Sequence, residues 1–438
     1  MARDAHDSST SPDAARACPR DCLLRAAHVV DLDGVCHSPG QVRVANGRAA
    51  AFGPAGDDAD GLPAVELQAS MPGTDSGPFL VLPGLVNAHA HLDLTLLGPV
   101  PRTPGQDFAA WATEVVWPAR RFTKAEALEA SVCDGIAVTR QAGVAAIGDM
   151  AASITALNAF VECDVPGRTY LELYGYGPET ASNVQIQIDA LRLLRDELEP
   201  ELARRVGLQP HAPYSAGPYT YAACADTDLP LATHLAEHAA EVDFVANQRG
   251  FFREELERYA QYVVDLPGYG EGLSPTACIE PVLRKAAGRF VAAHANFVED
   301  ADLTILAETR TSVACCPVAS DYFHHPLPPF RAMDAAGVNI CLGTDSVICQ
   351  PADEPQPHGI LPQMRRLFRE APDDAELPAL LVRMATANGY AALDLDPAAC
   401  MDRLCIVPLD GEPAGDPLRA ALAGSGIAEA YELSTGVG

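Results

Sequence analysis

The run PGLVNAHAHLDLT, residues 83–95, decides the fold of this 438-residue chain. It is an apolar segment that ends in two histidines, His89 and His91, separated by a single alanine. Side chains at positions i and i+2 of a β-strand point to the same face of the sheet. The run therefore predicts a buried strand that presents two imidazoles on one face at its carboxyl end.

Similar apolar runs recur along the middle of the chain. Together with FLVLPGLVNAHAH (79–91), they are VAAIGDM (144–150), RTYLELYG (168–175), VGLQPHAPYS (206–215), LPLATHLAE (229–237), FVAAHANF (290–297), TSVACCPVA (311–319) and NICLGTDS (339–346). Segments with helical periodicity lie between them, at 124–143, 183–198, 300–309 and 328–337. Strands alternating with helices favour a parallel sheet. Eight such units predict an α/β protein with a (β/α)8 barrel, whose catalytic residues lie at the carboxyl ends of the strands.

The two ends of the chain have a different pattern. Residues 22–54 are short apolar runs broken by Asp-Gly, Pro-Gly and Asn-Gly, and a β-like stretch, DRLCIVPLDG, follows the last strong helix at 402–411. These dipeptides are typical of turns between antiparallel strands. We expect a composite β-sandwich from 21–79 and 396–438, a barrel over 80–395, and a disordered polar tail over 1–20.

One connection within the expected barrel is longer than a single helix requires. Segment 239–290 contains a helical piece, NQRGFFREELERYAQYVV, and a glycine-rich piece, LPGYGEGLSP. Two interpretations stay open, a lid over the mouth of the barrel and a plain surface insertion.

The composition excludes several classes of partner. The formal net charge is -29, and only two of the 30 basic residues are lysines, Lys124 and Lys285. Binding to nucleic acid or anionic membranes requires clustered basic side chains, so we expect neither partner. The sequence contains no run of about 18 apolar residues that could span a bilayer. The polar N-terminus does not resemble a secretory signal. The 13 cysteines contain no CxxC pair, which favours reduced thiols in a cytoplasmic protein.

Histidines and an acid recur at the ends of the predicted strands. His211 ends the fourth strand, His234 the fifth and His294 the sixth, while Asp345 ends the eighth. Neutral imidazoles together with a carboxylate suit a zinc-like divalent ion, and an open coordination position makes such a site catalytic. The residues predicted to bind this metal are His89, His91, His234 and Asp345.

In combination these motifs resemble the amidohydrolase superfamily, and most closely its cytosolic deaminase and chlorohydrolase-like branch. That branch includes guanine, adenosine-like and aminodeoxyfutalosine deaminases. The resemblance covers about residues 20–420 and is strongest at PGLVNAHAHLDLT, THLAE, AAHAN, CCPVASDYFHHPLPPFRAMDAAGVNICLGTDS and MATANGYAAL.

The resemblance implies a barrel with a small composite β-sandwich and a single metal on the four ligands named above. It also implies that Glu237 is the general acid/base and that His294 orients the nucleophile or polarises the reacting centre. The metal would lower the pKa of its water, Asp345 would accept a proton, and Glu237 would protonate a ring nitrogen and then the departing amine.

The scarcity of lysine bears on the number of metals. Binuclear members of the superfamily usually bridge two metals with a carboxylated lysine at the end of the fourth strand, where this chain has His211. Neither Lys124 nor Lys285 can take that position, so we expect one divalent metal per chain, zinc rather than iron. His211 is expected to face the substrate, with a core histidine as the alternative.

The sequence restricts the substrate less. The DFAAWATEVVWPARR and YFHHPLPPF segments resemble aminodeoxyfutalosine deaminases more than guanine deaminases. Trp111 and Tyr322 could offer flat surfaces to a heterocycle, as could Trp117, Phe251 and Phe252, although ordinary packing is the alternative. The family often has other residues where this chain has Val318–Ser320 and Val347–Cys349, and we expect both stretches to line the substrate side.

The leading hypothesis is a metal-dependent aminohydrolase that releases ammonia from a small amino-substituted N-heterocycle, such as a purine nucleoside-like compound. The alternatives are hydrolysis of a cyclic amide or displacement of chloride from a triazine-like substrate, and a metal-binding relic without turnover. Whether the protein is a homodimer stays open.

Overall fold

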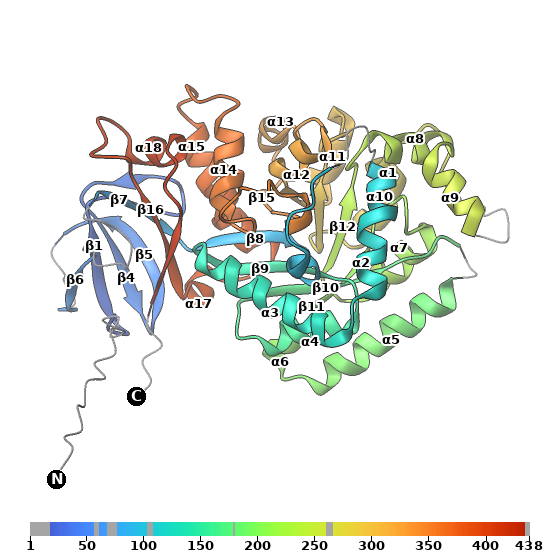
Figure 1. The fold of residues 1–438 in the computed structure, drawn as a ribbon, viewed down its shortest axis with the longest axis horizontal. Coiled ribbons are helices and arrows are strands. Elements are labelled where there is room, and N and C mark those ends of the chain that lie inside the picture. Colours follow the sequence, from blue (N-terminus) through green and yellow to red (C-terminus); the bar gives the residue numbers. More distant parts are fainter. Residues whose placement is uncertain are drawn as a thin grey trace, which may run out of the picture.

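The structure is a computed structural model that describes residues 18–56, 61–67, 77–102, 108–177, 180–259 and 266–433. Most of the tail that was predicted to be disordered, residues 1–17, lies outside these ranges. In Figure 1 two small sheets formed by the chain ends stand beside a larger barrel.

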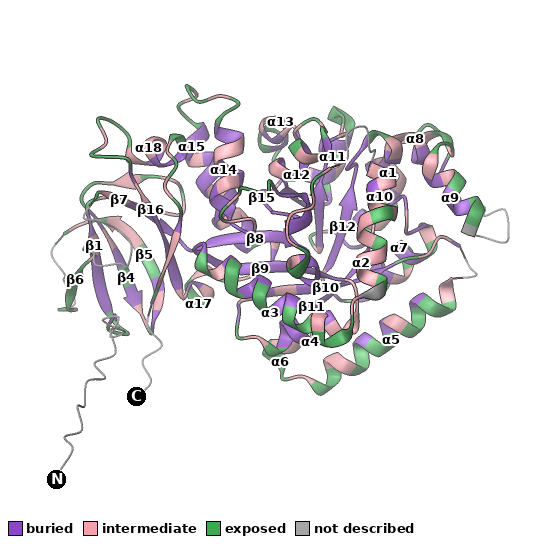
Figure 2. Ribbon diagram, viewed as in Figure 1, coloured by how far each residue is buried: buried purple, intermediate pink, exposed green. Residues whose placement is uncertain are grey.

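Within the described residues, eight parallel strands form the barrel, in the order β8-β9-β10-β11-β12-β13-β14-β15. They are β8 (Leu85–Ala90), β9 (Val144–Ala151), β10 (Gly167–Leu173), β11 (Val206–Pro210), β12 (Leu231–Leu235), β13 (Phe290–His294), β14 (Ser312–Cys315) and β15 (Ile340–Leu342). The predicted fold class is confirmed. Almost every residue of these strands is buried, as expected for a parallel sheet covered by helices (Figure 2).

The barrel closes between its first and last strands, at the end where the histidines lie. Ala90 and Asp345 form a parallel bridge. The backbone N–H groups of Thr344 and Asp345 each donate to the carbonyl oxygen of His89, at 3.0 Å. This closure brings the carboxyl end of β8 against the loop that follows β15.

Helices and short helical turns connect the strands. They are η1 (Leu92–Leu97), α1 (Phe108–Trp111), η2 (Ala112–Val116), α2 (Trp117–Phe122), α3 (Ala125–Gln141), α4 (Ile154–Glu162), α5 (Ala181–Glu197), α6 (Pro200–Ala203), α7 (Pro218–Ala225), α8 (Ala239–Asn247), α9 (Phe251–Tyr259), α10 (Pro275–Lys285), α11 (Asp300–Glu308), α12 (Pro317–Phe323), α13 (Phe330–Ala335), η3 (Val347–Cys349), α14 (Ile360–Phe368), α15 (Leu377–Ala385), α16 (Ala387–Ala392), α17 (Pro397–Cys400) and α18 (Pro417–Ala423). Several begin with local signals, such as Ser153 and Ser274, whose hydroxyls accept from the backbone N–H three residues on. No helix among these has the length and apolar composition to cross a bilayer.

Both chain ends contribute to the smaller sheets. In the described residues one sheet has the order β5-β4-β1-β6 and the other β17-β16-β7-β2-β3. Their strands are β1 (Cys22–Ala26), β2 (Val29–Val30), β3 (Cys36–His37), β4 (Gly40–Ala45), β5 (Arg48–Pro54), β6 (Ala64–Glu66), β7 (Phe79–Pro83), β16 (Arg403–Pro408) and β17 (Glu429–Glu432). The C-terminal strand β16 pairs antiparallel with β7, so one sheet contains both ends of the chain.

The apolar run 79–91 forms two strands in two different sheets. Its first half is β7, which belongs to the terminal sheet, and its second half is β8, which opens the barrel. The break falls at Pro83-Gly84, where a Cβ on Gly84 would lie 2.6 Å from the carbonyl oxygen of Arg403 and from Cβ of Ala145. The chain therefore passes directly from the terminal sheet into the strand that carries the histidines.

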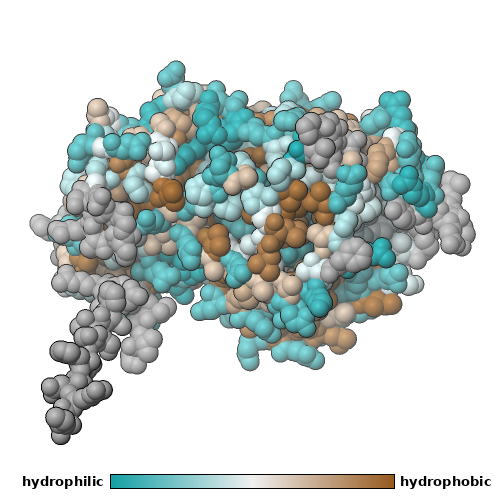
Figure 3. All heavy atoms as spheres, in the orientation of Figure 1, coloured by the Kyte–Doolittle hydropathy of each residue, from teal (hydrophilic) through white to brown (hydrophobic). Residues whose placement is uncertain are grey.

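The exterior is consistent with the large negative charge. The face shown in Figure 3 is mostly hydrophilic, with smaller hydrophobic patches towards its centre. A charge of -29 on a solvated surface favours solubility and repels polyanions.

Candidate metal centre and active site

The predicted metal ligands lie together at the carboxyl end of the barrel. His89 is near the end of β8, His91 follows that strand, and His234 lies in β12. Asp345 follows β15 in the loop that closes the barrel, and His294 is the last residue of β13. Parallel strands end at the same edge of the sheet, so these side chains converge although the sequence separates them widely.

The ligand atoms are close enough to share one ion. Nε2 of His91 lies 3.1 Å from Nε2 of His234 and 3.4 Å from Oδ1 of Asp345. Nε2 of His89 lies 3.7 Å from the same Asp345 oxygen. The ligand atoms of His89, His91 and His234 all lie within 4.8 Å of one another, as do those of His89, His294 and Asp345.

Strained backbone holds this cluster. Ala236, His294 and Asp345 adopt positive φ angles of 49°, 73° and 59°, a region that residues with a Cβ rarely occupy and that recurs at functional sites. In the closing loop, a Cβ on Gly343 would lie 2.7 Å from Cβ of His89. The GTDS motif therefore requires glycine so that Asp345 can approach the histidines.

The polar atoms of the cluster fit a divalent cation. The Nε2 atoms of His89 and His294 are buried and make no hydrogen bond to any described residue. His234 donates its Nδ1–H to the carbonyl oxygen of His211 at 2.9 Å, which leaves its Nε2 lone pair directed into the cluster. Burial alone would raise the pKa of Asp345, but the neighbouring imidazoles of His89, His91 and His294 bring it well below its usual range. An ionised carboxylate and neutral imidazoles are the donors that zinc-like ions prefer.

Glu237 lies beside this cluster, near His294. Its Oε1 is 3.8 Å from Nε2 of His294, and Tyr214 donates its hydroxyl to Oε2 at 3.3 Å. Burial raises the pKa of Glu237 well above its ordinary value, and the negative charges of Asp345 and Glu241 raise it further. A raised pKa favours the protonated form of a carboxyl group, the form that a general acid requires.

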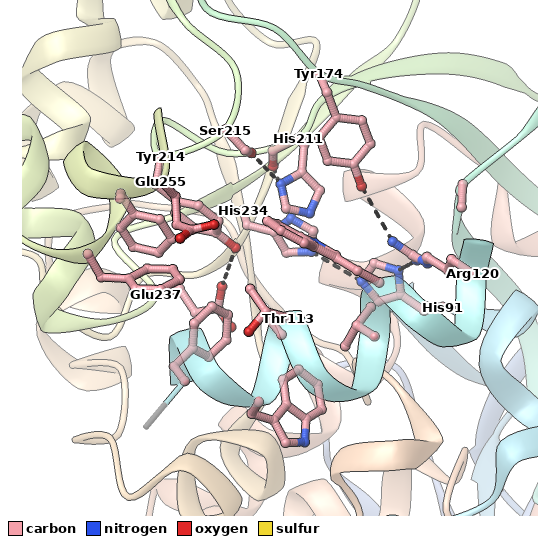
Figure 4. A pocket seen from close by; sticks show the side chains of 18 of the residues that line it. His91, Thr113, Arg120, Tyr174, His211, Tyr214, Ser215, His234, Glu237 and Glu255 are labelled. Atoms are coloured by element: carbon pink, nitrogen blue, oxygen red, sulfur yellow. Dashed lines mark hydrogen bonds between the residues drawn. The ribbon is translucent and has the colours of Figure 1, made fainter. Parts of the chain in front are cut away.

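His211 and His294 are neutral in this environment. Burial lowers the pKa of both imidazoles to about 3, with the positive charge of Arg120 adding to the effect on His211. Figure 4 shows His211 between Ser215 and His234. Its Nδ1 lies 2.6 Å from the hydroxyl of Ser215, and its ring stacks on Tyr174.

A group of charged residues beside the histidines was not predicted from the sequence. Arg120 of α2 contacts Asp93 of η1, Glu172 of β10 and Nδ1 of His91. Figure 4 shows Arg120 beside His91 and Tyr174. Two of these residues carried a signal, because Asp93 lies two residues after His91 and Glu172 precedes the end of a predicted strand. Nothing in the sequence indicated that Arg120 would reach the site.

Comparison with known proteins places the chain in a family. A profile of the amidohydrolase family matches residues 80–399. The chain belongs to the amidohydrolase family. It is therefore a metal-dependent hydrolytic enzyme, as predicted, and the alternative of a relic without turnover loses its support.

Curated relatives and solved structures agree with this membership. The chain is 30% identical over 331 residues to a 5'-deoxyadenosine deaminase of Methanothrix thermoacetophila, covering 74% of this chain and 71% of that one. It is 27% identical over 388 residues to a 5-methylthioadenosine/S-adenosylhomocysteine deaminase of Syntrophobacter fumaroxidans, covering 84% and 78%. Its fold matches a zinc-bound adenosine deaminase structure from Xanthomonas campestris with a TM-score of 0.70 at 20% identity, covering 94% and 92%.

A cavity of about 970 Å³ opens onto the histidine cluster of this amidohydrolase. His91, His211, His234, Glu237 and Asp345 line its floor. Its walls combine aliphatic, polar and charged residues with a group of aromatic side chains on α1, α2, α9 and α12, namely Phe108, Trp111, Trp117, Phe251, Phe252 and Phe323. Part of the segment predicted as a lid or an insertion, helix α9, thus forms one wall of the cavity.

Trp111 and Tyr322 occupy different positions relative to this cavity. Trp111 lines it, whereas Tyr322 lies behind Trp111, accepts the indole N–H at 3.0 Å and lines a second cavity. The neighbouring Phe323 takes the place on the wall that was expected for Tyr322.

The two unusual stretches of this amidohydrolase do not form the walls of the cavity. Val318 lines the second cavity, and Val347, Ile348 and Cys349 are buried behind Ser346, which does line the main cavity. The expectation that both stretches line the substrate side is therefore not met by the geometry.

Proposed function

We propose that this amidohydrolase hydrolytically deaminates an adenosine-like nucleoside, using one zinc ion held by His89, His91, His234 and Asp345. The observation that carries the proposal is the meeting of these four ligand side chains beside a buried Glu237 that is not one of them and lies 3.8 Å from His294. A ligand set with an open position and a separate proton donor is what hydrolysis of a C–N bond requires.

The side chains divide the proton transfers between them. A divalent metal at the cluster lowers the pKa of a coordinated water and so supplies the nucleophile. The low pKa of Asp345 keeps its carboxylate ionised, so the carboxylate can accept a proton. We assign this role to Oδ2, which lies 3.4 Å from Sγ of Cys349. Glu237, proposed to be protonated, donates its proton to a ring nitrogen of the substrate, which makes the adjacent carbon more electrophilic. The ionised Glu237 then takes the proton of the added hydroxyl and gives it to the amine, so that the C–N bond breaks, ammonia leaves and the C=O bond forms. The proton on Asp345 finally returns to Glu237. His294, neutral and 3.8 Å from Glu237, would accept a hydrogen bond from the attacking water and so orient it.

The names of the relatives and the shape of the cavity support the substrate class. Both curated relatives are deaminases whose names specify 5'-substituted adenosines. A cavity of about 970 Å³ is at the upper end of the range for small-molecule sites. The aromatic side chains in its walls suit a flat heterocycle, with Trp111 and His211 proposed to contact it, and Tyr322 proposed to support Trp111. A cytoplasmic location and the assembly state remain predictions.

The proposal is tested by ammonia release from the zinc-loaded protein. 5'-Deoxyadenosine, 5'-methylthioadenosine, S-adenosylhomocysteine and guanine are compared with a chlorotriazine and a cyclic amide. We expect ammonia from one or more of the adenosine compounds, with a spectral change from the adenine to the hypoxanthine ring. Chloride release or ring opening without ammonia from any adenosine compound would contradict the proposal.

A further inference from the structure

Glu172 is a buried carboxylate near the carboxyl end of β10 that the chemistry above does not use. It is 2% exposed and does not line the cavity. Its Oε2 accepts hydrogen bonds from Arg120 at 2.7 Å and from the Tyr174 hydroxyl at 2.9 Å. Its Oε1 is buried and has no hydrogen-bond partner among the described residues. A buried carboxylate oxygen without a donor is costly, so a partner for Oε1 is expected in the working enzyme.

Two imidazole nitrogens lie near Oε1 of Glu172, the oxygen without a hydrogen-bond partner. Nδ1 of His91 lies 3.7 Å from it and Nε2 of His211 lies 3.9 Å from it. Ser215 donates its hydroxyl to the carbonyl oxygen of Ala212 at 3.3 Å, so it accepts the Nδ1–H of His211 at 2.6 Å. Nε2 of the neutral His211 ring then carries only a lone pair. His91 is therefore the histidine that can donate to Glu172.

Arg120 fixes the position of Glu172. Its guanidinium has five N–H groups and no acceptor, and each N–H has a partner in the structure. Two groups bind Asp93, two bind Glu172 and the Tyr174 hydroxyl, and one lies 3.0 Å from Nδ1 of His91. Through these contacts Arg120 connects η1, β10 and the residue that follows β8.

The hydrogen bond from Arg120 to Nδ1 of His91 can form in only one tautomer of the neutral imidazole ring. Since Arg120 can only donate, Nδ1 of His91 accepts, and the neutral ring carries its proton on Nε2. Coordination of a cation requires the lone pair of Nε2, and the proton of the neutral ring then resides on Nδ1. An Nδ1–H cannot form a hydrogen bond with a guanidinium donor and needs an acceptor, and Oε1 of Glu172 lies 3.7 Å from Nδ1.

We propose that Glu172 is the positioning carboxylate of the metal centre. Held by Arg120 through Oε2, it accepts the Nδ1–H of His91 through Oε1 and so fixes the tautomer and orientation in which His91 binds the metal. Histidine ligands commonly donate their second ring N–H to such a carboxylate, and loss of that partner typically weakens metal binding 10- to 100-fold. The inference rests on the metal-dependent function proposed above.

Metal affinity tests the inference without relying on turnover. The dissociation constant for Zn²⁺ is measured by competition with a chromophoric chelator for the parent, for Glu172→Gln and for Tyr174→Phe. Glu172→Gln keeps the size of the side chain but removes the carboxylate, so we expect binding about 10- to 100-fold weaker. Tyr174→Phe is the matched control, because it removes a donor to Oε2 and leaves Oε1 intact, and its affinity should stay close to that of the parent.

The visible spectrum of the Co²⁺-loaded proteins gives a second readout. We expect the absorption bands of Glu172→Gln to shift relative to the parent, because the orientation of His91 changes, and those of Tyr174→Phe to match the parent. If Glu172→Gln does not fold, Arg120→Lys replaces it, since lysine keeps the charge but cannot hold the carboxylate in place, and weaker metal binding is again expected.

The outcomes separate the two proposals. A parent protein that binds no metal would overturn the proposed function and this inference with it. A parent that binds Zn²⁺ tightly, with a Glu172→Gln variant of equal affinity and identical Co²⁺ spectrum, would overturn the inference and leave the proposed function standing.

Discussion

Glu237 is the residue on which the proposed chemistry depends most directly. Burial raises the pKa of its carboxyl, and the negative charges of Asp345 and Glu241 raise it further. We expect Glu237→Gln to lower kcat by about 10²- to 10⁴-fold, the usual contribution of a general acid or base. Bound zinc, measured by elemental analysis, should not change, because Glu237 is not one of the four proposed ligands.

The matched control for this variant is Glu254→Gln, which neutralises an exposed carboxylate on α9. Its kcat should equal that of the parent. Full activity in Glu237→Gln would show that this residue is not the proposed general acid/base. Loss of bound zinc in the variant would show that Glu237 contributes to metal binding.

His358 predicts a loss of stability in mild acid. It is fully buried, its Nε2 lies 3.1 Å from the hydroxyl of Thr95, and burial lowers its pKa from 6.5 to about 4. Between these values the unfolded chain binds a proton that the folded chain does not, so stability is fully present above pH 6.5 and is lost as the pH falls towards 4. The full effect is on the order of 3 kcal/mol.

Urea unfolding of the metal-free parent and His358→Gln at several pH values measures this contribution. The difference in unfolding free energy between the two proteins should shift in favour of the variant by about 2 kcal/mol between pH 7.5 and pH 5. A difference that is constant over this range would show that His358 does not titrate differently in the folded chain.

At the scale of single residues, strand position predicted most of the cluster. His89, His91, His234, His294 and Asp345 could be found because the carboxyl ends of parallel strands meet at one edge. Arg120 could not, because it comes from a helix with no strand register and acts through contacts to three other elements. Tyr322 and Phe323 are neighbours on α12, and which of them faces the cavity depends on helix rotation that the sequence does not specify.

Among the elements, the strand β8 and the loop after β15 form the junction on which the site depends. The approach between them is close, since a Cβ on Gly343 would lie 2.7 Å from Cβ of His89 and 2.9 Å from its carbonyl oxygen. We expect Gly343→Ala to destabilise the protein by about 1–3 kcal/mol through overpacking. It should also weaken zinc binding, because His89 and Asp345 are displaced together.

Gly415→Ala is the control for this prediction, because no atom lies within 4 Å of the position that a Cβ on Gly415 would occupy. Its unfolding free energy should stay within about 0.5 kcal/mol of the parent. Thermal unfolding and chelator competition measure both effects. A Gly343→Ala variant with parental stability and zinc affinity would contradict the proposed tight closure.

The run 79–91 shows the limit of prediction at the scale of elements. Its hydrophobicity is continuous, so it was read as one strand, yet it forms β7 and β8 in two sheets. The division depends on the pairing of β7 with β16, whose residues lie more than 300 positions further along the chain. Segment 239–290 contains the helices α8, α9 and α10. Movement of this segment as a lid remains a prediction.

The pairing of β16 with β7 also connects the terminal sheets to the barrel. β16 pairs with β7, and β7 continues through Gly84 into β8, which bears His89. Leu404 of β16 is fully buried opposite Pro83, in a core cluster that also contains Val86 and Ala88 of β8. Damage to the terminal sheet should therefore reach the barrel.

Leu404→Ala tests this coupling. We expect it to destabilise the whole protein by about 2–5 kcal/mol, as large-to-small changes in a core do. The two tryptophans of the chain, Trp111 and Trp117, both lie in the barrel region, so tryptophan fluorescence reports on the barrel alone. Its unfolding midpoint should fall together with that of the circular dichroism signal.

Ile427→Ala serves as the control here, because that side chain is 48% exposed and its removal should change stability little. An early loss of dichroism in Leu404→Ala, with an unchanged fluorescence midpoint, would show that the terminal sheets unfold independently of the barrel.

The central claim is that one divalent metal on His89, His91, His234 and Asp345 makes this amidohydrolase a deaminase. It is tested most directly by titrating metal-free protein with Zn²⁺ while ammonia release from 5'-deoxyadenosine is followed. We predict no release without metal and a linear rise that ends at one equivalent of zinc per chain. Activity that survives complete metal removal, or that requires a second equivalent, would contradict the account.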